Sequence, residues 1–407
     1  MTAITEDGST LKRTLTLPLL ALYGLGVTVG AGIYVLIGET AALAGPYAPA
    51  AFMIAAIVVG FTAYSYAELS TRMPVSAGEA AYVEAGLKRV WLARLTGLAV
   101  ATSGVVSAAA VAIGAGGYLA GLTGLPTPTL TAGVVLVMGL IAWWGITESV
   151  TIAAVITVIE ILGRICVIYW GFGVAESEGR DLSDMIPPLS GDHWAGLGAA
   201  SLLAFFAFVG FEDMVNVAEE VKDPRHTLPR AITITLVVAT LLYVAVAAAV
   251  LYALPLERLA GSEAPLMLVF DAAPRGVQVT FAAVAAVATV NGVLIQIVMA
   301  SRVLFGMADR GQLPAALAYI SPMTRTPATA TFLVVAIIFV LSSFFPIAEL
   351  AGGTSQIVLC VFILVNLSLL AMKLSKSPSG DAFSVPIIIP ILGTLTSLGL
   401  LATPLLS

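Results

Sequence analysis

Charged residues are scarce in this sequence. Lys, Arg, Asp and Glu together make up only 10% of its 407 residues, whereas apolar residues make up 59%, and the mean hydropathy is +1.03. A soluble globular domain carries about 25% charged residues, so the composition excludes a water-soluble protein. The sequence therefore predicts an integral membrane protein.

Histidine and cysteine are also rare. We expect both histidines, His193 and His226, to lie in loops, and no Cys–His or Ser–His–Asp arrangement is apparent. We therefore expect neither an enzyme active site, nor a metal cluster, nor a cofactor. Cys166 and Cys360 fall in apolar segments, where they are expected to pack as small apolar side chains rather than form a disulfide. The net charge of −6 offers no basic patch for nucleic acid.

Runs of about 20 apolar residues predict membrane spans. We identify eleven windows, near residues 15–37, 48–66, 92–120, 128–146, 150–174, 196–220, 230–253, 278–306, 328–346, 350–374 and 383–405. The first run follows Lys12 and Arg13 and contains no small-residue cleavage site. We therefore expect it to remain as a span rather than be removed as a signal peptide.

The placement of Lys and Arg predicts the orientation in the membrane. Fourteen of the eighteen fall in segments that are cytoplasmic if the N-terminus is inside; Arg180, Arg258 and Arg275 fall in outer loops, and Arg164 lies within a span. Because cytoplasmic loops carry the excess of Lys and Arg, we predict a cytoplasmic N-terminus. Eleven spans then leave the C-terminus outside, in a multi-pass protein of the plasma (inner) membrane.

Glycines interrupt the first apolar run. They stand at Gly24, Gly26, Gly30 and Gly32, and with Ala31 between the last two the main chain is accessible to a ligand. Unwinding here would expose a helix N-terminus, whose N–H groups and dipole suit a carboxylate. The alternative is close helix packing through small residues.

A second interruption lies in the sixth window, where Glu212 follows an aromatic run containing glycine. Acids in a span are costly unless they face a polar cavity, so we favour a functional Glu212 over a helix N-cap. Phe206, Phe208 and Phe211 either shape an apolar pocket, with Phe206 as its lid, or pack against neighbours. Unwound backbone is tolerated in a bilayer only when buried in protein or lining a cavity, and paired interruptions point to a transporter's binding site.

The two interruptions suggest an internal repeat. Residues 14–174 and 196–374 then form two five-helix units, each opening with an interrupted helix, and the helix at 383–405 lies outside both. Units with an odd number of spans have opposite topology, which is the inverted-repeat plan. No loop is long enough to fold alone, so we expect one transmembrane domain over residues 1–407.

Several stretches follow an order typical of one transporter family. They are VGAGIY at 29–34, YAEL at 66–69, MPVSAGEAAY at 73–82, FAFVGFE at 206–212, EEVKDP at 219–224 and ASRVLFGMADRGQLP at 300–314. Through them the sequence resembles the amino acid–polyamine–organocation family over its first ten spans. The resemblance implies an all-α LeuT-type fold, a 5+5 inverted repeat with helices 1 and 6 broken, here with one extra helix.

The resemblance also implies a substrate site. The substrate carboxylate would meet the amides of Gly30, Ala31 and Gly32, and the ammonium would meet main-chain carbonyls, with an aromatic gate beside them. The carbonyls would be those of Thr28, Phe206 and Val209, the gate would be Phe206, and Ala207 and Gly210 would complete the site. Glu212 matches an acid that is linked to coupling in some members.

One departure from the family concerns the fifth span. Many relatives carry a lysine at the place of Glu160, and an acid cannot supply its fixed positive charge. Glu160 and Arg164 are four residues apart and can pair on one helix face. Either they form a neutral pair that fixes packing, or Glu160 carries a proton or helps bind a cation. In the second case Glu160, Arg164 and Glu212 take part in coupling to H⁺ or Na⁺, and Glu160→Gln changes ion dependence more than affinity.

These features favour a secondary active transporter that moves a small amino acid or related amine across the bilayer by alternating access. Proton coupling, sodium coupling and exchange all fit the sequence. The alternative is a substrate-sensing receptor or regulatory subunit of the same fold that binds without transporting.

Overall fold

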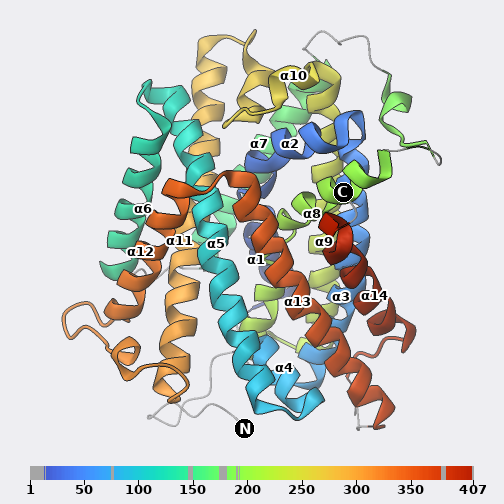
Figure 1. The fold of residues 1–407 in the computed structure, drawn as a ribbon, viewed down its shortest axis with the longest axis vertical. Coiled ribbons are helices and arrows are strands. Elements are labelled where there is room, and N and C mark those ends of the chain that lie inside the picture. The colour runs from blue at the N-terminus through green and yellow to red at the C-terminus, as the bar shows by residue number, and fades with distance from the viewer. Residues whose placement is uncertain are drawn as a thin grey trace.

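The protein is helical throughout its described parts, apart from one β-bridge between Leu15 and Val221. The computed structural model (Figure 1) describes residues 13, 15–74, 78–144, 150–173, 181–188, 191, 193–376 and 382–405. The longer helices are α1 (Leu17–Thr28), α2 (Gly32–Ala44), α3 (Ala48–Arg72), α4 (Gly78–Leu87), α5 (Val90–Thr123), α6 (Thr127–Trp144), α7 (Val150–Gly173), α8 (His193–Phe206), α9 (Pro224–Ala253), α11 (Arg275–Asp309), α12 (Ala328–Phe344), α13 (Ile347–Leu374) and α14 (Ile388–Ala402). The short ones are η1 (Gly45–Tyr47), η2 (Leu182–Met185), η3 (Phe211–Glu220), α10 (Leu256–Leu259), η4 (Pro265–Phe270), η5 (Ala315–Ala318) and η6 (Thr403–Leu405).

Many of these helices are suited to a membrane. Among the described residues, eight helical segments are long and apolar enough to cross one: Gly32–Arg72, Val90–Thr123, Thr127–Trp144, Ala154–Gly173, His193–Glu220, Pro224–Ala253, Arg275–Asp309 and Ile347–Leu374. Three shorter apolar helices, α1, α12 and α14, accompany them. Each of the eleven windows predicted from the sequence contains helix, which agrees with a multi-pass membrane protein.

Some sequence-based expectations need correction or lie outside the described residues. The histidines are not in loops, because α8 begins at His193 and α9 at Pro224, two residues before His226; proline is well suited to a first helical turn. Cys166 and Cys360 are free, as predicted. Lys12, Arg180, Val75–Ala77 of one family motif, and residues 14, 145–149 and 174 lie outside the described parts of the chain.

Both interruptions predicted from the sequence are present. Helix α1 ends at Thr28 and α2 begins at Gly32, while α8 ends at Phe206 and η3 begins at Phe211. Gly210 closes the second break with φ +119°, a conformation that only glycine adopts readily. A Cβ atom on Gly210 would also lie 2.7 Å from the carbonyl oxygen of Val27 in the first break. The two breaks therefore lie against each other in the centre of the molecule.

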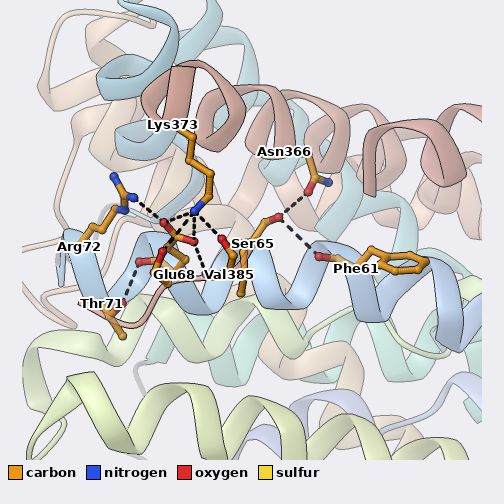
Figure 2. A network of polar contacts seen from close by, with 9 residues as sticks. Phe61, Ser65, Glu68, Thr71, Arg72, Asn366, Lys373 and Val385 are labelled. Carbon is orange, nitrogen blue, oxygen red and sulfur yellow. Dashed lines mark hydrogen bonds and ion pairs between the residues drawn. The ribbon is translucent and has the colours of Figure 1, made fainter. Parts of the chain in front are cut away.

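A buried carboxylate joins three helices at the end of α3 (Figure 2). Glu68 is fully buried, and its oxygens accept hydrogen bonds from Arg72 Nη2 at 2.5 Å, Lys373 Nζ at 2.7 Å and the Val385 N–H at 2.7 Å. Arg72 lies on the same helix, Lys373 lies in the last turn of α13, and Val385 precedes α14. One turn away, Asn366 of α13 accepts from Ser65 Oγ of α3 at 2.7 Å. This network fixes α3, α13 and the start of α14 together.

Glu68→Gln should destabilise the protein more than loss of one of its partners. The substitution leaves Arg72 and Lys373 near each other without an anion, which costs about 3–5 kcal/mol for a broken buried pair. Lys373→Met leaves Arg72 still paired with Glu68 and should cost about 1.5–3 kcal/mol, the contribution of a hydrogen bond to a charged group. Apparent melting temperatures of detergent-purified protein should therefore rank E68Q below K373M and K373M below wild type. Lys376→Met is the matched control, because Lys376 is exposed; equal melting temperatures for K373M and K376M would contradict the stabilising role.

A second buried carboxylate attaches α4 to α3. Glu79 is 4% exposed, and its Oε1 accepts a 3.4 Å hydrogen bond from the Tyr66 hydroxyl. Burial raises the pKa of the Glu79 carboxyl from 4.5 to about 7, and the nearby Asp213 acts in the same direction. The folded protein therefore holds a proton on Glu79 at pH values where the unfolded chain has released it.

Glu79→Gln should remove one source of pH dependence in stability. Because the folded pKa is above the unfolded one, stability falls as pH rises from about 4.5 and levels off above about 7. The shift corresponds to about 3 kcal/mol at pH 8, so E79Q should melt higher than wild type at pH 8 and at nearly the same temperature at pH 5. A melting difference that does not change between these pH values would show that Glu79 titrates normally.

Candidate functional site

A small cavity lies between the two helix breaks. Its volume is about 40 Å³, and it collects residues from both breaks and from α5, α7 and α11. The lining includes eight of the residues predicted from the sequence: Thr28, Gly30, Ala31, Gly32, Glu160, Phe206, Ala207 and Val209. We call this space the central cavity.

The remaining predicted residues lie beside the central cavity. Gly210 and Glu212 line a neighbouring cavity of about 20 Å³, which also borders Tyr66 and Glu79. Arg164 is fully buried on α7 behind the first break. The structure therefore places eight of the predicted residues on the central cavity. Gly210, Glu212 and Arg164 lie beside this cavity but do not line it.

The glycines in and near the first break have two different surroundings: some are in close contact with neighbouring helices, and one is not. A Cβ atom on Gly24 would lie 2.4 Å from Met214 Sδ, one on Gly26 would lie 2.2 Å from Thr157 Oγ1, and one on Gly32 would lie 2.6 Å from Ala207 Cα. These three glycines allow close packing. A Cβ atom on Gly30 would meet nothing nearer than 3.7 Å, so its main chain faces the central cavity. Both interpretations of the glycine pattern thus apply, at different positions.

The phenylalanines also differ in their surroundings. Phe206 lines the central cavity, where a gate was predicted. Phe208 packs edge-on against Tyr243 with ring centres 5.0 Å apart, and Phe211 packs against Phe362 at 5.5 Å. Phe208 and Phe211 are therefore packing residues, whereas Phe206 faces the site.

Glu212 holds the end of the second break. Its Oε2 accepts a 2.9 Å hydrogen bond from the Gly210 N–H, one of the donors left free where the helix is interrupted. Gly210, not Glu212, is the N-cap of η3, and Glu212 lies in the first turn, from which its carboxylate binds back to the N–H of that N-cap. The carboxylate reaches the neighbouring 20 Å³ cavity as well.

The predicted side-chain pair of Glu160 and Arg164 takes a different form. Within the described residues no ion pair joins the two side chains; Arg164 Nη1 donates to the main-chain oxygen of Glu160 at 2.8 Å, and Nη2 donates to the carbonyl of Gly30. The guanidinium also lies over the Tyr34 ring, 4.6 Å from its centre. Spacing along one helix indicated the pairing, but the unwound carbonyl of Gly30 competes for the guanidinium. Arg164 therefore holds the first break.

Tyr243 of α9 was not identified from the sequence, yet it joins the two breaks. It is fully buried, and its hydroxyl lies 2.6 Å from the Thr28 carbonyl and 2.7 Å from the Ala207 carbonyl. One hydroxyl proton is thus shared between a carbonyl of each break. The sequence signal was weak, because Tyr243 is one of two tyrosines, with Tyr252, within the apolar run of α9.

Polar residues of α11 were also missed. Asn291 and Gln296 line the central cavity together with Ser107 of α5, and Gln296 Oε1 is buried without a hydrogen-bond partner among the described residues. Polar side chains within a predicted span mark polar cavities. That signal was present in the sequence.

A larger cavity, which we call the vestibule, leads from the central cavity to the surface. Its volume is about 910 Å³, and it shares Gly26, Val27, Glu160, Asn291 and Ile295 with the central cavity. Its outer wall contains the exposed residues Glu84, Arg94, Arg302 and Arg310. It borders α4, which lies at the opposite end of the molecule from α10 (Figure 1).

This geometry suits reversible binding of a small polar molecule. The first N–H groups of α2 have no partner within their own helix, and Gly30, Ala31 and Gly32, at and just before the start of α2, line the central cavity. A helix N-terminus of this kind favours an anionic group. Glu160 places a carboxyl group on the wall shared with the vestibule.

Comparison with known proteins extends these observations. The model of a family described as amino acid permease matches residues 15–407. The branched-chain amino acid permease BcaP of Bacillus subtilis is 29% identical, over 94% of this chain and 86% of that protein.

Two further relatives are named for other substrates. The vacuolar cationic amino acid transporter 2 of Arabidopsis thaliana is 31% identical, over 90% of this chain and 61% of its own length. The methylthioribose transporter of Bacillus subtilis is 27% identical, over 95% of this chain and 87% of its own length. These relatives are transporters, not enzymes. With a family match over nearly its whole length, the chain belongs to the amino acid permease family, within the amino acid–polyamine–organocation transporters that its motifs indicated.

Proposed function

We propose that this protein is a secondary active transporter that moves a small amino acid or related amine by alternating access. The observation that carries the proposal is the central cavity, which lies between two helix breaks and is lined by residues of both. Its similarity to permeases named for branched-chain and cationic amino acids supports the substrate class.

In this proposal the substrate carboxylate binds the amino terminus of α2 at Gly30, Ala31 and Gly32. Phe206 acts as the gate over the substrate, and Thr28, Ala207, Val209 and Gly210 contribute main-chain groups around it. Their positions in or beside the central cavity support these roles.

The vestibule would be the route to the cytoplasm. Arg94, Arg302 and Arg310 on its outer wall belong to the excess of basic residues that predicts the cytoplasmic side. In this orientation the structure is inward-facing, with the N-terminus in the cytoplasm, the C-terminus outside and the plasma membrane around the helices.

The proposed topology has eleven spans in a LeuT-type arrangement. Two inverted five-helix units, residues 14–174 and 196–374, would each begin with a broken helix, and α14 would be the additional span. The position of the breaks in α1–α2 and α8–η3 supports this plan.

Coupling to H⁺ or Na⁺ would use the charged groups at the breaks. Glu160 faces both cavities, Arg164 holds the Gly30 carbonyl, and Glu212 holds the Gly210 N–H. A change in the charge or ligation of any of them alters how one break is held, which would link ion binding to movement of the broken helices.

Gradient-driven uptake tests the proposal directly. Purified protein in liposomes should accumulate labelled amino acids under an imposed proton or sodium gradient, and Gly32→Val should reduce uptake by at least tenfold, because even its Cβ would lie 2.6 Å from Ala207 Cα. Gly60→Val is the matched control, since a Cβ at Gly60 meets nothing within 4 Å. Ligand binding without flux by folded wild-type protein would favour the receptor alternative, and G32V with full uptake would contradict the site.

Tyr243→Phe should slow transport while the protein stays folded. The variant leaves two buried carbonyls, of Thr28 and Ala207, without their shared donor, a loss of about 1–3 kcal/mol. We expect a lower maximal uptake rate and a modestly lower melting temperature. Tyr252→Phe on the same helix is the control, because the Tyr252 side chain lies away from both breaks and packs on Phe172; identical behaviour of the two variants would rule out a role for the Tyr243 hydroxyl.

A further inference from the structure

Glu160 is the ionisable residue of the central cavity. Among the described residues that line this cavity, no other has an ionisable side chain. The side chain is 2% exposed, and its Oε2 has no hydrogen-bond partner in the described parts of the chain. A buried carboxylate oxygen without a donor is costly, so this oxygen is suited to a donor that arrives from outside the chain.

Arg164 does not fill this role. Its Nη1 and Nη2 donate to the main-chain oxygens of Glu160 and Gly30, and the guanidinium plane is held over Tyr34. The arginine therefore supplies a nearby positive charge but no hydrogen bond to the Glu160 carboxylate. Oε2 of Glu160 is thus left without a donor from the described parts of the chain, at a residue that lines the central cavity.

The main-chain carbonyls expected to bind a substrate ammonium are mostly engaged within the protein. The Thr28 carbonyl lies 2.6 Å from the Tyr243 hydroxyl, and the Phe206 carbonyl accepts from the Val209 N–H at 3.1 Å. A carbonyl can accept a second bond, but a hydrogen bond to a charged acceptor is about twice as strong as a neutral one. A cationic donor in this cavity therefore favours Glu160 over these carbonyls.

The neighbours of Glu160 complete a polar wall for such a donor. Thr28 is 2% exposed and its Oγ1 also lacks a partner among the described residues. Asn291 of α11 borders both the central cavity and the vestibule, as Glu160 does. The amino terminus of α2 lies on the same cavity, where it suits an anionic group. Positive and negative ligand groups thus have separate sites.

We infer that Glu160 is the binding residue for the protonated amine of the substrate, and that it selects amines over analogues of the same skeleton that lack the amino group. This rests on the transport function proposed above, since it assigns one group of that substrate to one side chain. A hydrogen bond to a charged group changes affinity by about 10- to 100-fold. Ligands that lack the amino group gain none of this affinity.

Binding measurements with matched ligand pairs test the assignment. The probes are leucine with 4-methylpentanoate, lysine with 6-aminohexanoate, and phenylalanine with 3-phenylpropanoate, each pair differing only in the α-amino group, together with methylthioribose as an uncharged probe. Their dissociation constants are measured on the full-length detergent-purified protein at one pH and one salt concentration. Variants are Glu160→Gln and, as the control for charge, Glu349→Gln, because Glu349 is exposed at the start of α13.

For at least one pair, wild type and E349Q should bind the amino acid about 10-fold or more tightly than its partner. In E160Q this ratio should fall to about 1–3. A ratio unchanged in E160Q overturns the assignment, and so does wild-type protein that binds methylthioribose but shows no preference for the amino group. If Glu160 serves only ion coupling, E160Q alters the gradient dependence of uptake and leaves the ratio intact.

Failure of the proposed function has a different signature. Wild-type protein that is folded but binds none of the probes contradicts the amino acid transporter itself. If E160Q does not fold, Glu160→Asp keeps the charge and withdraws the carboxylate by one methylene. This variant should lose affinity for the amino acid more than for its desamino partner, and equal losses for both overturn the assignment.

Discussion

The structure depends on satisfying the main-chain groups that two broken helices release inside a membrane protein. Hydrocarbon offers these groups no partners, and each unsatisfied one costs several kcal/mol. The Tyr243 hydroxyl serves a carbonyl of each break, Arg164 serves the Gly30 carbonyl, and Glu212 serves the Gly210 N–H. Three side chains from α9, α7 and η3 thus make both interruptions tolerable.

These contacts also decide which groups face a ligand. The carbonyls of Thr28 and Ala207 accept from Tyr243 and that of Gly30 accepts from Arg164, whereas the first N–H groups of α2 have no partner within their own helix. A helix N-terminus carries a partial positive charge. Glu160, with Thr28 Oγ1 and Asn291 nearby, provides the opposite polarity. The cavity therefore offers a helix N-terminus, which suits a negative ligand group, and a carboxyl group, which suits a positive one.

The sequence predicted features that depend on local pattern and missed those that depend on distant contacts. Apolar runs predicted where the helices lie, and glycines together with intramembrane acids predicted where both breaks lie, because these residues act directly on the local backbone conformation. The spacing of Glu160 and Arg164 indicated a pair on one helix face, whereas Arg164 reaches Gly30, 134 residues away. Tyr243 contacts Thr28 from 215 residues away. No local pattern encodes such contacts, although the polar residues Asn291 and Gln296 within a span did mark the cavity wall.

The contact between Gly32 and Ala207 has a consequence for how this site can change over evolution. A Cβ atom at position 32 would meet the Cα atom of residue 207, which no side-chain rotamer can relieve. Growth at one position must therefore be matched by displacement of the facing backbone. Position 32 is therefore restricted to a residue without a side chain, and the shape of the central cavity can change more readily through the residues of α7 and α11 that line it.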